Sequence, residues 1–187
     1  MIRGILGIDP GLDGGLVLLG HDRQVIKRWV MPVLEDRTSV KKRDTGKIKT
    51  TVKRNIDICA YAEIMLTHRE QIEYVILEQV SARPDQGVSG MFKFGFTAGI
   101  IEGVLAALKI PYLKVAPVTW TKELHKDMNP NYFITMEAKE RSRHVAKTLF
   151  PEVDLRENQR CKNMHDGLVD GILLAEYGLR KHSLGAL

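Results

Sequence analysis

The chain has 187 residues, of which 44% are hydrophobic and 27% are charged. This composition favours one globular domain over residues 1–187 and argues against a disordered or low-complexity chain. No apolar run approaches the roughly 18 residues that a membrane span needs, and the chain enters a predicted strand at once. We therefore expect neither a membrane partner nor a signal or transit peptide. The two cysteines, Cys59 and Cys161, have no CxxC partner, which indicates a reducing setting. We expect the cytoplasm of a bacterial or phage-infected cell, or an organelle if a transit peptide has been removed.

The net charge of +5 and the isoelectric point near 9.2 are typical of proteins with a polyanionic partner. The basic residues are concentrated in two segments. The segment 37–54 contains eight basic residues and a single acid, Asp44. The basic residues are Arg37, Lys41, Lys42, Arg43, Lys47, Lys49, Lys53 and Arg54. The other comprises Lys139, Arg141, Arg143 and Lys147. Each cluster alone is compatible with solvated surface, but two clusters that flank one candidate site favour contacts with nucleic acid.

The first half of the chain predicts strands and one helix. Residues 2–9, 15–20 and 24–31 have the apolar or alternating pattern of strands and predict an antiparallel meander. The segment 36–53 carries Asp44-Thr45-Gly46 at its middle, as a long hairpin does. A helical pattern follows over 53–69, and 74–79 predicts a buried strand.

The second half is mainly helical. A Gly/Pro/Ser-rich loop at 81–90 precedes a long apolar helix at 92–109, and a strand follows at 112–116. Helices are predicted from Pro117, over 135–149 and over 164–180. This order predicts an α/β fold with a mixed five-stranded sheet flanked by helices.

Two acids stand at predicted strand ends, Asp9 in "GILGIDPG" and Glu78 in "YVILEQ". If the strand at 74–79 returns through a crossover helix, it pairs in parallel with the strand at 2–9. Both acids then lie at the carboxyl ends of neighbouring central strands, where ligands of open α/β sheets bind. Two such carboxylates repel each other unless a cation lies between them.

The last helix carries Asp166 and Asp170, which are four residues apart and share one helix face. A solvent-facing acidic stripe near a helix N-terminus is the alternative, because the helix dipole favours an acid there. Gly167 and Gly171 each follow one of these acids, at a cost of roughly 1 kcal/mol each relative to alanine inside a helix. Their presence indicates close approach of the strand backbone or of a substrate.

Together the acids predict a metal site. Its ligands are Asp9, Glu78, Asp166 and Asp170. A site rich in carboxylate oxygen suits Mg²⁺, for which Mn²⁺ can substitute, rather than zinc. Two such ions about 4 Å apart catalyse phosphodiester hydrolysis. His165 is either a supporting base or an ordinary capping or surface histidine.

These motifs resemble those of the RuvC family of Holliday junction resolvases, which have a ribonuclease H-like fold. "GIDPG", "ILEQV" and "HDGLVDGILLAEYG" are similar to the three acidic motifs of that family. "QGVSGMFKFG", "TWTK" and "KTLFP" resemble its phage and chloroplast branch. The resemblance implies that the four acids are a catalytic tetrad, that Lys122 and Lys139 are catalytic or DNA-backbone lysines, and that a homodimer nicks a four-way junction twice on strands of like polarity. The spacing between Asp166 and Asp170 departs from the three residues of bacterial members.

We further expect a DNA surface around the site. The predicted phosphate contacts are Lys41, Lys42, Arg43, Lys47, Lys49, Lys93, Lys122, Lys139, Arg141 and Arg143. Phe92 is predicted to stack on bases at the junction centre, whereas Phe94 is expected to join the apolar core.

Three other functions compete with junction resolution. An actin-like or sugar-kinase ATPase requires a second domain and a second phosphate loop, which 187 residues do not hold. A ribonuclease H-like enzyme acting on hybrid or other branched nucleic acid uses a similar carboxylate set. A non-catalytic junction-binding protein gains nothing from four acids at a DNA surface, because acids there weaken binding.

Overall fold

The computed structural model describes residues 2–41, 48–79, 81, 87–126, 128 and 136–185. Its centre is a five-stranded sheet with the strand order β3-β2-β1-β6-β7. The strands are β1 (Gly4–Asp9), β2 (Gly15–Gly20), β3 (Val25–Val30), β6 (Ile72–Glu78) and β7 (Tyr112–Val115). β1 pairs antiparallel with β2 and parallel with β6. The predicted mixed sheet, with its meander and its parallel return beside the first strand, is therefore confirmed.

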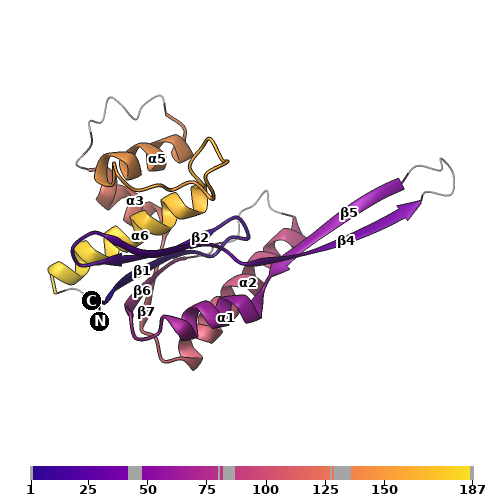
Figure 1. Ribbon diagram of the computed structural model, residues 1–187, viewed down its shortest axis with the longest axis horizontal. Coiled ribbons are helices and arrows are strands. Elements are labelled where there is room, and N and C mark those ends of the chain that lie inside the picture. Colours follow the sequence, from indigo (N-terminus) through magenta and orange to yellow (C-terminus); the bar gives the residue numbers. More distant parts are fainter. Residues whose placement is uncertain are drawn as a thin grey trace.

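Helices cover both faces of the sheet (Figure 1). One face packs on α6 (Asp166–Ser183), against which α3 (Pro117–His125) and α5 (Ala138–Leu149) lie. The other face carries α1 (Ile58–Thr67) and α2 (Val88–Ala107). Successive β1 side chains point to opposite faces of the sheet. Ile5 therefore belongs to the core cluster under α6, whereas Leu6 and Ile8 belong to a second core cluster that includes residues of α2. Both faces of β1 are buried, which explains its continuous apolar sequence.

The start of α6 lies directly on the strand backbone. A side chain at Gly7 would overlap the carbonyl oxygen of Gly171, and one at Gly167 would overlap the backbone of Gly14. An isolated bridge also joins Gly14 to Gly167. The prediction of close approach is confirmed, and the approaching group is the strand backbone.

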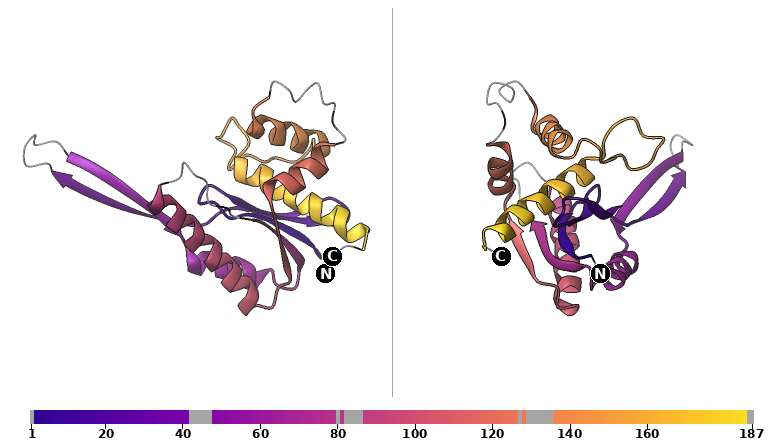
Figure 2. Two further views of the ribbon diagram at one scale, coloured as in Figure 1. Left: turned by 180° about the vertical axis from the view of Figure 1, so that it is seen from behind. Right: turned by 60° about the vertical axis from the view of Figure 1, so that its left-hand side comes forward.

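The hairpin is longer than predicted. β4 (Val33–Lys41) and β5 (Ile48–Ile56) form a separate two-stranded sheet that projects away from the body of the protein (Figures 1 and 2). The prediction that residues 53–69 are helical was wrong at its start. Asp57 caps the helix instead, since its carboxylate accepts a hydrogen bond from the Ala60 N–H at 3.0 Å, so α1 begins at Ile58.

Helix α2 departs from the expectation about membranes, because residues Val88–Ala107 are long and apolar enough to cross one by length and composition. The same composition is found in helices that pack on a protein core. Ile101 and Leu105 are fully buried against the sheet. The other helices differ from prediction by a few residues at their ends, which is the usual uncertainty of helix boundaries.

Candidate active site

The four predicted acids lie at one edge of the sheet. Asp9 ends β1 and Glu78 ends β6, and these strands are hydrogen-bonded neighbours in which Ile8 lies opposite Leu77. Asp9 and Asp170 line a cavity of about 530 Å³, and Glu78 and Asp170 line a second cavity of about 410 Å³. Because Asp170 lines both cavities, the acids from β1, β6 and α6 form one continuous site.

The acids influence one another electrostatically. Burial, together with the charges of Asp9, Glu78 and Asp166, raises the pKa of Asp170 to about 8. Burial also raises the pKa of Asp9, although a hydrogen bond from the Gly11 N–H to Asp9 Oδ1 at 3.1 Å opposes this shift. The cluster therefore favours any cation that offsets the mutual repulsion of its carboxylates.

Asp166 has a different environment from the other three acids. Partial burial would raise its pKa, but hydrogen bonds from Lys139 and Arg143 outweigh that effect and leave the pKa below its usual value. Lys139 Nζ lies 2.9 Å from Asp166 Oδ2, and Arg143 Nη2 lies 2.6 Å from Asp166 Oδ1. Asp166 thus positions two cations of α5 beside the carboxylates.

Two residues that the sequence analysis did not identify orient the acids. The Trp120 indole N–H donates to Glu78 Oε1 at 3.1 Å, and the Trp120 side chain is buried. Ser142, also buried, forms a hydrogen bond with Asp170. Trp120 lies in the "TWTK" motif, so this motif could have identified it. The sequence analysis instead assigned a catalytic or DNA-binding role to Lys122 of the same motif.

His165 lies near Asp9, where its charge would lower the pKa of that acid. It occupies the N-cap position of α6, yet its side chain makes no capping hydrogen bond. Its Nδ1 is buried and has no hydrogen-bond partner within the described ranges. The capping interpretation is therefore wrong, and the role of a supporting base stays a prediction.

The donor set fits a hard divalent cation. Asp9, Glu78 and Asp170 offer only carboxylate oxygens, which Mg²⁺ and Mn²⁺ prefer, and their repulsion is relieved by positive charge. Across the residues that the structure describes, no group of three His, Cys, Asp or Glu side chains already has the spacing of a metal site.

The predicted DNA contacts have different outcomes. Lys139 and Arg141 line the second cavity beside Glu78. Lys122 is exposed on α3 and lines neither cavity, and Lys93 is exposed on α2. Lys42, Arg43 and Lys47 lie outside the described residues, and only the backbones of Lys41 and Lys49 are described, within β4 and β5.

Two of the three phenylalanines of α2 were assigned roles from the sequence, and Phe94 does not lie where it was expected. Phe94, which was assigned to the core, is only half-buried and lines the cavity that contains Asp9. Phe92 is 74% exposed, lines neither cavity and stacks on Phe96 with ring centroids 6.4 Å apart. The assignment of Phe94 to the core was wrong, because its side chain belongs to neither core cluster and lines the cavity instead.

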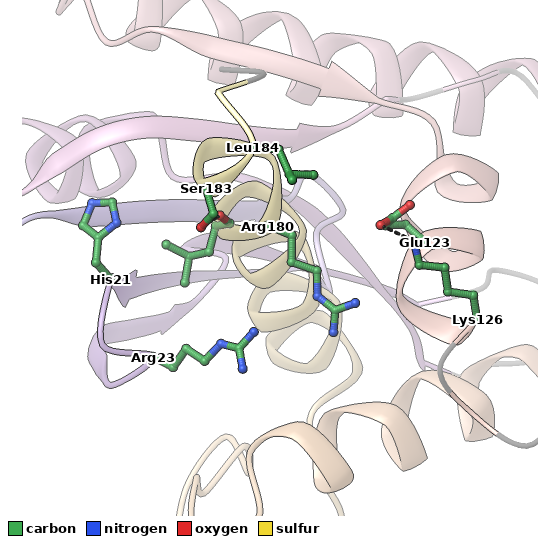
Figure 3. Close-up of a pocket in the computed structure, with 8 residues that line it drawn as sticks. His21, Arg23, Glu123, Lys126, Arg180, Ser183 and Leu184 are labelled. Carbon is green, nitrogen blue, oxygen red and sulfur yellow. Dashed lines mark hydrogen bonds and ion pairs between the residues drawn. The ribbon is translucent and has the colours of Figure 1, made fainter.

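A further cavity, of about 380 Å³, lies at the opposite end of α6 and contains none of the four acids (Figure 3). Its cations have acidic partners: Lys126 pairs with Glu123 at 2.7 Å, and Arg23 and Arg180 both contact the fully buried Glu176 at 2.6 and 2.9 Å. Arg23 has a left-handed backbone, with φ of 62°. The ion pair of Arg23 with Glu176 anchors the β2–β3 turn to α6.

A sheet of this strand order, with acids at the ends of its two central parallel strands and on the helix that crosses it, defines the ribonuclease H-like fold. No known family profile and no curated protein matches the sequence. Solved structures do match. T. thermophilus RuvC in complex with a Holliday junction substrate is 15% identical, with a TM-score of 0.56, over 98% of this chain and 97% of that chain.

Two other solved structures also match, with lower TM-scores. A second structure of Thermus thermophilus RuvC is 18% identical, with a TM-score of 0.50, over 97% of this chain and 96% of that one. The yeast mitochondrial Holliday junction resolvase Ydc2 is 11% identical, with a TM-score of 0.48, over 98% of this chain and 81% of that one. At this identity the likeness to the two RuvC structures establishes the fold alone, and the assignment to the phage and chloroplast branch stays a prediction.

Proposed function

We propose that the protein is a Mg²⁺-dependent endodeoxyribonuclease that resolves Holliday junctions by paired nicking. The observation that carries the proposal is the convergence of Asp9, Glu78 and Asp170 at one edge of a ribonuclease H-like sheet. The complex of T. thermophilus RuvC with a junction supports the choice of substrate. The basic clusters on the hairpin and α5 supply the phosphate contacts that this substrate needs.

In this proposal each residue of the site has a definite task. Asp9, Glu78 and Asp170 would hold the metal, with Asp166 at its margin. The bound metal would supply an activated water and charge stabilisation at the leaving oxygen. Trp120 and Ser142 keep the carboxylates of Glu78 and Asp170 oriented through their hydrogen bonds. Lys139, beside Asp166, faces the cavity in which the scissile phosphate would lie.

Cleavage of defined substrates tests the function. The protein is incubated with Mg²⁺ and a four-way junction, a linear duplex of the same sequence, or an RNA–DNA hybrid. We expect cleavage of the junction alone. Preferential cleavage of the hybrid would instead establish a ribonuclease H-like enzyme, and binding of the junction without cleavage would establish a non-catalytic junction-binding protein.

The hairpin is proposed to bind the DNA backbone through Lys41, Lys42, Arg43, Lys47 and Lys49. Replacing any one of them with Ala should reduce the slope of log affinity against log salt concentration by about one, because one fewer counterion is released. Junction titrations at several salt concentrations measure this slope. Arg3→Ala, at the opposite end of β1 from Asp9, is the control and should keep the wild-type slope. Unchanged slopes in the hairpin variants would assign the cluster to solvated surface.

A homodimer is the proposed functional unit, because one chain carries one carboxylate site and paired nicking requires two. The outer face of α2 offers a surface for the second copy. Phe96 is exposed on this helix, and Gly95, Gly99 and Gly103 recur every fourth residue with nothing within 4 Å of an added side chain. Small residues at this spacing let two helices approach closely, and contiguous exposed apolar surface marks interaction sites.

The mass of the protein in solution tests this interface. Gly99→Glu should convert the dimer to a monomer, because it places a charge where the two helices meet. Leu66→Glu is the matched control, since Leu66 is 64% exposed on α1, and it should remain dimeric. Light scattering measures both masses, and a dimeric Gly99→Glu variant would rule out this face of α2.

A further inference from the structure

Arg54 connects the hairpin to the turn that follows Asp9. Its Nη1 donates to Asp13 Oδ1 at 2.7 Å, and its Nη2 donates to the Leu12 carbonyl oxygen at 3.2 Å. Arg54 belongs to β5, whose register pairs it with Glu35 of β4. One guanidinium therefore fixes both a side chain and a backbone carbonyl of this turn, which a lysine cannot do with the same geometry.

The turn at residues 11–14 sets the position of the Asp9 carboxylate. The Gly11 N–H donates to Asp9 Oδ1 at 3.1 Å, and the Gly14 N–H closes the turn on the Gly11 carbonyl at 2.9 Å. Its far end is fixed, because the Met31 N–H donates to the Gly14 carbonyl at 3.0 Å and Gly14 packs on Gly167. Leu12 and Asp13 are the part of the turn that Arg54 holds.

The contribution of this contact to stability is small. Asp13 is 83% exposed and Arg54 is 36% exposed, and exposed ion pairs contribute about 0–1 kcal/mol. Its effect is geometric, since it joins the hairpin, which projects from the body of the protein (Figure 2), to the turn that follows Asp9. DNA held along the hairpin would thereby be placed in a fixed position relative to Asp9.

We propose that Arg54 is a positioning residue, which holds the turn at residues 11–14 and so couples the engagement of DNA by the hairpin to the placement of the Asp9 carboxylate. This inference rests on the proposed nuclease function. It assigns to Arg54 a role in the rate of cleavage that is separate from any contribution of its charge to DNA affinity.

Two variants that keep the charge of Arg54 test the proposal. Arg54→Lys removes the two-pronged contact, and Asp13→Ala removes its main acceptor without removing a cation. With junction at saturating concentration and Mg²⁺, we expect each variant to cleave about 10- to 100-fold more slowly, because a displacement near 1 Å costs about that much. Junction affinity should be unchanged or slightly tighter in Asp13→Ala, and both melting temperatures should remain close to that of the wild type.

The double variant and a matched control complete the experiment. Arg54→Lys combined with Asp13→Ala should be no slower than the slower single variant, because both changes break one contact. Arg156→Lys is the matched control, because it removes a comparable exposed two-pronged contact. Arg156 Nε and Nη2 donate to the two carboxylate oxygens of Asp154 at 2.9 Å, and this variant should cleave at the wild-type rate. Wild-type cleavage rates in Arg54→Lys, additive losses in the double variant, or losses confined to affinity would each overturn the proposal. A wild-type protein that does not cleave the junction would instead contradict the proposed function itself.

Discussion

Replacing Asp9 with Asn should lower junction cleavage at least about a hundredfold and leave junction binding intact. The carboxylate lies at the end of β1, in the same cavity as Asp166 and Asp170, where it would bind the metal. Metal catalysis supplies several kcal/mol of transition-state stabilisation, and each 1.4 kcal/mol lost is a tenfold loss of rate. Binding persists, or becomes tighter, because the variant removes a negative charge near the DNA phosphates. Single-turnover cleavage and junction titration measure the two effects separately.

The other acids provide comparisons for this variant. Glu78→Gln, Asp166→Asn and Asp170→Asn should behave in the same way as Asp9→Asn. Asp22→Asn is the control, because Asp22 is an exposed acid in the turn between β2 and β3 and should cleave at the wild-type rate. Wild-type cleavage by Asp9→Asn with Mg²⁺ would contradict the metal site.

Gly167→Ala should destabilise the fold by about 3 kcal/mol or more. A methyl group at this position would overlap the backbone of Gly14, and the neighbouring atoms are backbone atoms that cannot rotate away. Overpacking of a rigid contact typically costs about 1–3 kcal/mol, and more where backbone must shift. Relief would require α6 to move off the sheet, which also moves Asp166 away from Asp9. Urea denaturation measures the free energy of unfolding.

Gly171→Ala is the matched control in the same helix. Its methyl group would meet a side-chain atom of Val17 at 3.2 Å and the Gly15 carbonyl oxygen at 3.3 Å, contacts that a shift of a few tenths of an ångström relieves. Alanine is also favoured over glycine inside a helix by about 1 kcal/mol. The unfolding free energy of Gly171→Ala should therefore lie within about 1 kcal/mol of the wild type. Equal losses in the two variants would show that the contact at Gly14 is not the cause.

The sheet and its four acids could be predicted because their signals are local. The strand of residues 4–9 is a continuous apolar run that ends on Asp9, and the strand ending on Glu78 has the same form. Parallel pairing then brings these acids together without further information. The spacing of Asp166 and Asp170 likewise fixes one helix face.

The contacts that orient the acids could not be predicted in the same way. Trp120 is 42 residues from Glu78, and Arg54 is 41 residues from Asp13, so no short-range pattern connects them. The helix was predicted to begin at residue 53 because the apolar spacing of α1 does not itself mark where the helix starts. The start is set by Asp57, which caps the helix at its N-terminus. The position of Phe94 depended on the rotation of α2 about its axis, which the apolar composition of that helix does not specify.

Mapping the nicks on a mobile four-way junction tests the central claim most directly. The junction is labelled on each strand in turn and incubated with the protein and Mg²⁺, with and without EDTA. The proposed function predicts two nicks at symmetry-related positions on strands of like polarity, ligatable duplex products, and no cleavage with EDTA or with Asp9→Asn. Cleavage that persists in EDTA, or cuts placed equally on linear duplex and junction, would contradict it.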